Sequence, residues 1–169
     1  MKKLIVATIV GLMSVLMGPV SPASALPDWR TTGTHWTNAK AKQPQVTDLR
    51  YATHQNFDRV VIEIRGRIPG GRTSYHRRFF YDGSGKPVPI RAGLLVILRP
   101  AYTYDADGNN VYDGPDLVRP GFPTLKAIAL TGNFEGQVSF AFGLSPRRAP
   151  HRVFMLHNPQ RLVIDFKHN

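Results

Sequence analysis

The chain has 169 residues and a formal net charge of +11, with 42% hydrophobic, 10% aromatic and 20% charged residues. This composition is that of a packed globule and excludes a disordered tail or a coiled coil. The absence of cysteine excludes disulfides, thiolate chemistry, lipidation at cysteine and cysteine-based zinc sites.

The first 25 residues have the pattern of a secretory signal peptide. Lys2 and Lys3 form a positive start, residues 4–17 are apolar, and Ala23-Ser24-Ala25 fits an A-x-A cleavage site. We therefore expect export and removal of residues 1–25. Two of the 22 Lys and Arg residues precede this site and all 11 acidic residues follow it, so the mature net charge is about +9. No later stretch is apolar for the length that a transmembrane helix needs.

The predicted export changes which partners the positive charge favours. A secreted basic protein meets lipid headgroups, anionic wall polymers and polysaccharides first, so nucleic acid is not an expected partner. We expect a secreted, extracellular protein that associates with the cell wall. In the simpler interpretation, the charge only keeps the protein soluble.

Residues 26–44 contain Thr, Gly, Asn, Lys and Pro without periodicity, which is typical of an extended leader. Both tryptophans of the chain, Trp29 and Trp36, lie in this leader. We expect them to dock on the domain as a flap rather than to stack on a ligand.

From Gln45 to residue 169 the pattern is that of strands. Short apolar runs are separated by Gly, Pro and Asn, and no stretch of ten residues has a helical period. The sequence thus predicts an all-β domain, a small β-sandwich of short, mostly antiparallel strands. A turn is expected at residues 68–72. The expected strand segments are 46–51, 60–65, 73–81, 94–98, 127–130, 138–142, 153–156 and 162–166.

Two-residue alternation within these runs also predicts the core. Asp58 and Asp165 lie beside arginines at strand ends, so we expect structural hydrogen bonds or ion pairs from them. The predicted core residues are Val60, Ile62, Ile64, Leu94, Val96, Leu98, Ile128, Leu130, Val138, Phe140, Phe142, Leu162, Ile164 and Phe166.

The sequence contains no recognisable catalytic motif. Neither G-x-S-x-G nor H-E-x-x-H is present, and Glu63 and Glu135 are the only glutamates. His151 and His157 would stand about 20 Å apart on an extended strand, too far to share a metal. We therefore expect no catalytic residues and no enzyme activity.

The firmest chemical signal is a run of arginines. Between Arg59 and Arg91 the chain carries eight cations, seven of them arginine, against two acids. The planar guanidinium matches carboxylate and phosphate groups, and aromatic residues among the arginines suit sugar faces. A solvated strand face is the alternative. The candidate residues for binding the wall are Arg65, Arg67, Arg72, Arg77 and Arg78.

Residues 105–116 are acidic, with four aspartates and no Lys or Arg. On a twelve-residue calcium-loop template, Asp105, Asp107, Asn109 and Asp113 supply oxygen ligands. Asn110 stands where the template has glycine, and Asp116 stands where it has a bidentate glutamate. A solvated loop without an ion is the favoured alternative, and calcium is the one cofactor that we consider.

Several segments together resemble the AMIN-like domain of secreted actinobacterial proteins. They are VTDLR (46–50), NFDRVVIE (56–63), GNFEG (132–136), FGL (142–144) and NPQRLVIDF (158–166). The resemblance covers residues 45–167, and the last segment is its most specific part. The related AMIN domain is a small β-sandwich that accompanies cell-wall amidases and secretins and targets them to peptidoglycan. The resemblance thus implies a non-catalytic envelope module that binds peptidoglycan or an anionic wall glycan. An envelope protein-protein adaptor and a cell-wall hydrolase are the alternatives.

Overall fold

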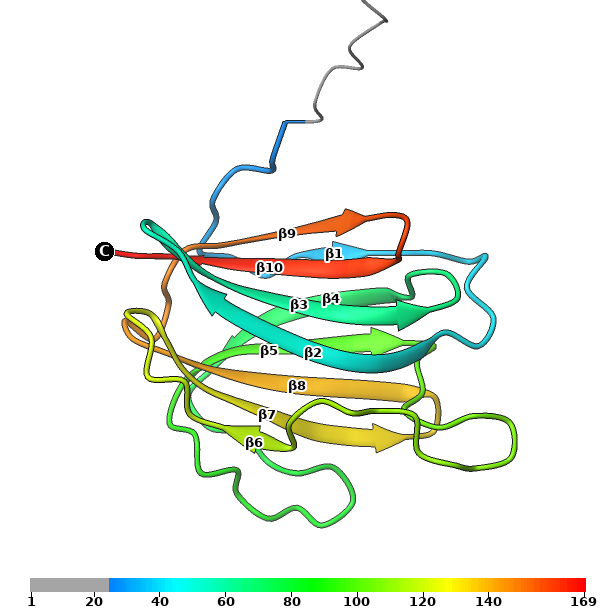
Figure 1. Cartoon of the computed structure of the whole chain (residues 1–169). Coiled ribbons are helices and arrows are strands. Elements are labelled where there is room, and N and C mark those ends of the chain that lie inside the picture. Colours follow the sequence, from blue (N-terminus) through cyan, green and yellow to red (C-terminus); the bar gives the residue numbers. More distant parts are fainter. Residues whose placement is uncertain (1–24) are drawn as a thin grey trace, which may run out of the picture.

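The computed structural model describes residues 25–169, so the predicted signal peptide, apart from Ala25, lies outside the described residues. The chain folds into two packed antiparallel sheets (Figure 1). One has six strands in the order β1-β4-β5-β8-β7-β6, and the other has four in the order β2-β3-β10-β9. The predicted all-β sandwich is confirmed. The strands are β1 (His35–Trp36), β2 (Gln45–Thr53), β3 (Phe57–Arg65), β4 (Gly70–His76), β5 (Gly93–Arg99), β6 (Leu117–Val118), β7 (Leu125–Phe134), β8 (Gln137–Leu144), β9 (His151–Leu156) and β10 (Arg161–Lys167).

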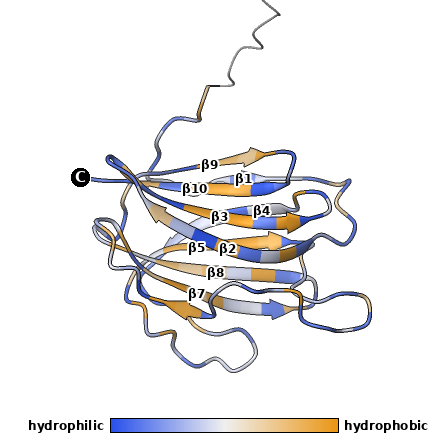
Figure 2. Ribbon diagram, in the orientation of Figure 1, coloured by the Kyte–Doolittle hydropathy of each residue, from blue (hydrophilic) through white to orange (hydrophobic). Residues whose placement is uncertain are grey.

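Each strand segment expected from the sequence corresponds to one of the longer strands. The two-residue strands β1 and β6 were not expected, because two residues carry no periodicity. Apolar residues follow the strands, and hydrophilic residues gather in the turns (Figure 2). No helix in residues 25–169 is long and apolar enough to cross a membrane.

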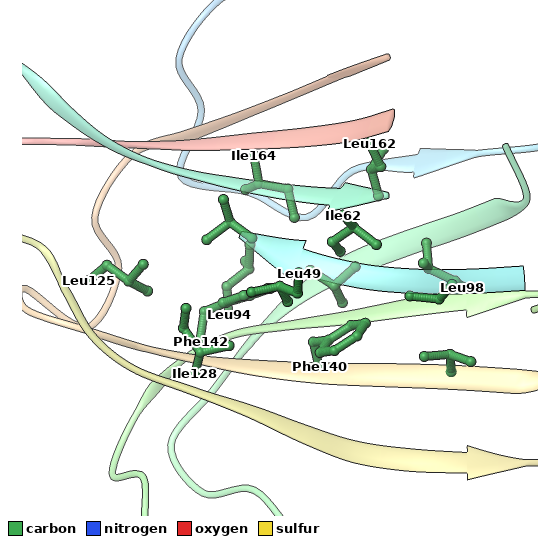
Figure 3. Packing of buried hydrophobic residues seen from close by; sticks show 14 of the residues in the cluster. Leu49, Ile62, Leu94, Leu98, Leu125, Ile128, Phe140, Phe142, Leu162 and Ile164 are labelled. Carbon is green, nitrogen blue, oxygen red and sulfur yellow. The ribbon is translucent and has the colours of Figure 1, made fainter. Parts of the chain in front are cut away.

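The core lies between the two sheets, where their inward side chains meet (Figure 3). All of the predicted core residues are buried except Leu130, which is partly buried and packs against the cluster. The Phe142 ring lies 6.4 Å from that of Phe140 and 5.6 Å from that of Phe166, so one aromatic row spans both sheets. Burial of each such side chain contributes about 1.5–3 kcal/mol.

A second, smaller core lies on the outer face of the six-stranded sheet. The long loop between β4 and β5, whose course Figure 1 shows, packs onto this face. Its residues Phe79, Val88 and Ile90 lie against small residues of β7 and β8. The prediction of a strand over 73–81 is therefore wrong beyond His76. The chain leaves the sheet there so that Phe79 can cover Ala141 and its neighbours.

The turn predicted at residues 68–72 is also wrong from Gly70 onward, because Gly70 and Gly71 begin β4. A Cβ on Gly71 would lie 2.5 Å from Trp36 Cζ2 and 2.7 Å from the Ile97 carbonyl oxygen. Glycine is thus needed for the close approach of the Trp36 ring rather than for a turn.

Residues 30–36, here called the N-terminal clasp, join the two sheets at one side. Arg30 and His151 of β9 exchange two backbone hydrogen bonds of 2.9 Å each. Further along the clasp, β1 pairs with β4, and Trp36 Nε1 donates to the Pro69 carbonyl at 2.9 Å. Trp36 also packs against the core, so this tryptophan docks on the domain as expected.

Candidate binding surface

The outer face of the six-stranded sheet carries an open groove beside the β4–β5 loop. Two adjoining hollows of about 400 and 230 Å³ share Ile97 of β5 and Gln137 of β8 as lining residues. The first hollow lies at β1 and the start of β4, and the second lies against the loop. We call the two together the outer groove. Its other lining residues are His35–Ala39, Gly70–Arg72 and Arg99 in the first hollow, and His76, Arg78–Phe80, Asp82, Leu95, Thr131 and Ser139 in the second.

Strand alternation and register bring the cations of the groove together. Arg72 pairs with Ile97 across β4 and β5, and Arg99 pairs with Gly70, so both arginines lie on the outward face. Arg78 joins them from the loop. None of these three arginines forms an ion pair with a carboxylate among residues 25–169. Their guanidinium groups are exposed and free to meet an anion.

The groove also offers an aromatic rim and hydrogen-bonding groups. Phe80 lies at the edge of the groove, and its side chain is 53% exposed. Asp82 is the one carboxylate that lines the groove, and Ser139 Oγ donates to it at 3.1 Å, while the Asp82 backbone N–H donates to the Thr131 carbonyl. Because three arginines face this one carboxylate, the net charge that the groove offers to a ligand is positive.

The five arginines predicted to bind the wall do not share one face. Arg72 and Arg78 line the outer groove, and Arg77 lines a smaller hollow beside it. Arg65 ends β3 in the other sheet, where its Nη1 donates to Gln45 Oε1 at 3.3 Å, and Arg67 lies exposed before β4. Their role in binding stays a prediction.

Sequence reasoning missed several lining residues of the groove, notably Arg99 and Gln137. The signal for Arg99 was available, because it continues the outward register of Leu95 and Ile97 in β5. Gln137 begins β8, and only the pairing of β5 with β8, in which Leu98 lies opposite Val138, brings it to the Arg99 end of β5.

Residues 105–116, here called the acidic loop, are closed by hydrogen bonds within the loop. Asp105 Oδ1 accepts from the backbone N–H groups of Asp107 at 3.0 Å and Asn109 at 2.9 Å, and Oδ2 accepts from Asn109 Nδ2 at 3.2 Å. These bonds, led by the Asn109 backbone, lower the pKa of Asp105. Asp113 lies further along, where its N–H donates to the Thr47 carbonyl. Residues 25–169 contain no group of three His, Asp or Glu side chains that could hold a metal, and calcium binding by Asp105, Asp107, Asn109 and Asp113 stays a prediction.

His151 is the most deeply buried histidine, and it has structural partners. Tyr75 donates its hydroxyl to the Ala149 carbonyl at 2.6 Å, so its oxygen accepts from His151 Nδ1 at 2.8 Å. His151 Nε2 lies 3.1 Å from Thr73 Oγ1, which also accepts from the Thr34 N–H. Burial, aided by the charge of Arg30, lowers the pKa of His151 to about 4. The imidazole is therefore a neutral link between the sheets and the clasp.

A family model for the AMIN-like domain matches residues 44–168. The chain belongs to the AMIN-like domain family. No curated protein and no solved structure matches it. AMIN-like domains are generally non-catalytic binding modules, which fits a role in the cell envelope.

In this AMIN-like domain, side-chain bonds join residues 56–63 and 158–166, two of the segments that carried the resemblance. Asp58 lies buried and accepts from the backbone N–H groups of Thr124 and Leu125 at 2.8 Å each, which fixes the start of β7. The next residue, Arg59, forms a two-bond ion pair with Asp165 of the closing segment. These residues hold strands together and do not line the outer groove, so they act in the fold, as expected for Asp58 and Asp165.

Proposed function

We propose that this AMIN-like protein is an exported, non-catalytic module of the cell envelope. It binds peptidoglycan that carries anionic polymer, and the outer groove is its binding surface. The observation that carries the proposal is that Arg72, Arg78 and Arg99, none of them paired with a carboxylate among residues 25–169, line the two adjoining hollows of the outer groove.

The chemistry of the groove supports a polyanionic glycan. Exposed guanidinium groups bind phosphate and carboxylate through paired N–H donors. Phe80 at the rim offers an apolar face to a sugar ring, and Gln137 offers both a donor and an acceptor to hydroxyl groups. The two hollows follow one another along the sheet, which suits a chain of several sugars better than a single small molecule.

The experiment is a sedimentation pull-down of the protein with purified wall material, with and without its anionic polymers, across a salt series. The test variant is Arg72→Gln/Arg99→Gln. The matched control, Arg161→Gln/Lys167→Gln, removes two charges from β10 in the other sheet.

Binding by the unmodified protein should weaken as salt rises, because exposed charges are screened over about 8–10 Å. The test variant should lose about tenfold in affinity while the control keeps it. An equal loss of affinity in both variants would mean that only net charge matters. Binding that changes neither with salt nor in the variant that lacks Arg72 would refute the groove as the binding surface.

An envelope adaptor is the second candidate, and the edge of the four-stranded sheet favours it. β9 ends this sheet, and Met155 on it is 36% exposed. An extended segment of a partner protein could pair with such an edge. Failure of the pull-down, together with capture of an envelope protein that is lost in Met155→Pro, would support this function instead.

A further inference from the structure

A third hollow adjoins the outer groove and collects arginines from two distant parts of the chain. It has a volume of about 160 Å³ and shares the lining residue His76 with the groove. Arg77 follows β4, whereas Arg147 and Arg148 lie in the loop between β8 and β9. Tyr75 completes the lining, and we call this hollow the arginine pocket.

The arginine pocket has no negative charge to balance its cations. No carboxylate lines it, and Arg77, Arg147 and Arg148 form no ion pair with the acidic residues that the structure describes. Three guanidinium groups around one small hollow repel one another. An anion bound among them would be attracted by all three and would offset that repulsion.

One side of the pocket, formed by Tyr75 and Arg148, is held in shape before any ligand arrives. The guanidinium of Arg148 lies over the Tyr75 ring at 5.3 Å, and its Nη2 donates to the Thr31 carbonyl at 3.3 Å. Tyr75 itself is fixed by its bonds to Ala149 and His151. Burial raises the pKa of Tyr75 to about 12, so the phenol stays neutral near pH 7. Because these groups are already ordered, less entropy is lost when an anion binds.

We infer that the arginine pocket binds a single phosphate group. Three guanidinium forks are best matched by at least three acceptor oxygens, which inorganic phosphate and a phosphate monoester have and a carboxylate or a diester lacks. The volume is below that of ordinary small-molecule sites, so it suits one compact anion and excludes a chain of sugars.

This assignment does not rest on the function proposed for the outer groove. The phosphate is a monoester or free inorganic phosphate, because a diester keeps only two unesterified oxygens, no more than a carboxylate has. If the groove binds no polymer, the arginine pocket still binds phosphate.

Isothermal titration calorimetry tests the inference with four probes at constant ionic strength: inorganic phosphate, methyl phosphate, dimethyl phosphate and acetate. The test variants are Arg147→Gln/Arg148→Gln and the single Arg77→Gln, which leaves the contact between Arg148 and Tyr75 in place. Arg147→Lys/Arg148→Lys keeps the charge but removes the planar fork. Arg161→Gln/Lys167→Gln is the matched control, and circular dichroism verifies that each variant is folded.

The unmodified protein should bind inorganic or methyl phosphate about tenfold or more tightly than acetate. The double Gln variant should lose about tenfold or more in affinity, Arg77→Gln and the Lys variant less, and the control should match the unmodified protein. Dimethyl phosphate should bind as weakly as acetate, because it too has two charged oxygens. Tighter binding of methyl phosphate than of inorganic phosphate identifies a monoester as the natural form, and the reverse order identifies the free ion. Equal binding of acetate and phosphate, or equal affinity in the folded Gln variants and the control, would overturn the assignment.

Discussion

Asp165 is completely buried, and its carboxylate accepts two hydrogen bonds from the Arg59 guanidinium, from Nε at 2.6 Å and from Nη2 at 2.9 Å. Arg152 of β9 donates from Nε at 2.8 Å to Asp165 Oδ2, the same oxygen that accepts from Arg59 Nη2. One carboxylate therefore joins β3, β10 and β9 across the outer face of the four-stranded sheet. Aromatic rings cover the two guanidinium groups. The guanidinium carbon of Arg152 lies 4.3 Å from the centre of the Trp29 ring.

Replacement of this carboxylate should destabilise the domain strongly. Asp165→Asn keeps the shape but leaves two partly buried guanidinium groups without their counter-charge. Loss of one partner of a buried pair costs about 3 kcal/mol or more, and we expect a loss of that order in the free energy of unfolding. Urea denaturation measures it, with the exposed Asp107→Asn as the control. A loss below about 0.5 kcal/mol would show that the pair is no stronger than a surface salt bridge.

Asp58 should make the domain sensitive to acid. Burial acts to raise its pKa, but hydrogen bonds from the Leu125 backbone, His168, Thr53 and the Thr124 backbone outweigh it, so its pKa lies below the ordinary value. A carboxyl whose folded pKa is depressed stabilises the fold above its unfolded pKa of about 3.9, and this stability is lost as the pH falls further.

Urea denaturation between pH 5 and 2.5 measures this effect. Asp58→Asn should be less stable at pH 5 and should show a flatter decline below about pH 4. Identical pH slopes in the variant and the unmodified protein would contradict the role given to Asp58.

His151 should act in a higher pH range. Its pKa is about 4 in the folded protein and about 6.5 in the unfolded chain. Between pH 6.5 and 4 the imidazole is therefore protonated in the unfolded chain and neutral in the folded protein. The stability that follows from the neutral imidazole is therefore complete above pH 6.5 and falls between pH 6.5 and 4, by about 3 kcal/mol in total.

NMR titration of the His151 ring locates its folded pKa directly. His151→Gln should be less stable at pH 7 and should lose the decline between pH 6.5 and 4, while the decline caused by Asp58 remains. A folded pKa for His151 near 6.5 would refute the prediction.

Gly71→Ala should loosen the N-terminal clasp. The added methyl would meet the Trp36 ring and the Ile97 carbonyl, and overpacking of this kind costs about 1–3 kcal/mol. We expect a lower Tm and a red shift of tryptophan fluorescence as Trp36 becomes exposed. In Trp36→Ala, the same Gly71→Ala change should cost less, because the Ile97 contact alone remains. An equal cost in both backgrounds would show that the ring does not require glycine.

The sequence predicted those features that depend on neighbours along the chain. Ile62 and Ile64 were placed in the core because alternation reports which face of a strand is buried. Phe79 was placed in a strand because a β-rich composition does not distinguish a strand from a loop that packs on a sheet. The strand at Gly70 was mistaken for a turn because glycine serves both a turn and a close contact.

The candidate sites depend on strand order, which local patterns do not carry. Arg72 and Arg99 meet because β4 pairs with β5, and these arginines are 27 residues apart in the sequence. Arg147 meets Arg77 only because the β8–β9 loop returns past the end of β4. A count of arginines indicated the chemistry of binding, but their grouping required the fold.

The N-terminal clasp also determines how the domain responds to mechanical force. A pull on the chain before Trp29 acts first on the contact of Trp29 with Arg152, then on the two backbone bonds of Arg30 to His151 and on the short pairing of β1 with β4, so these contacts break one after another. A pull at the C-terminus acts along β10, which lies between β3 and β9 and resists through two complete ladders in shear. The two ends of the domain therefore differ in strength, and a tether at the N-terminal side would yield by several residues while the sandwich stays folded.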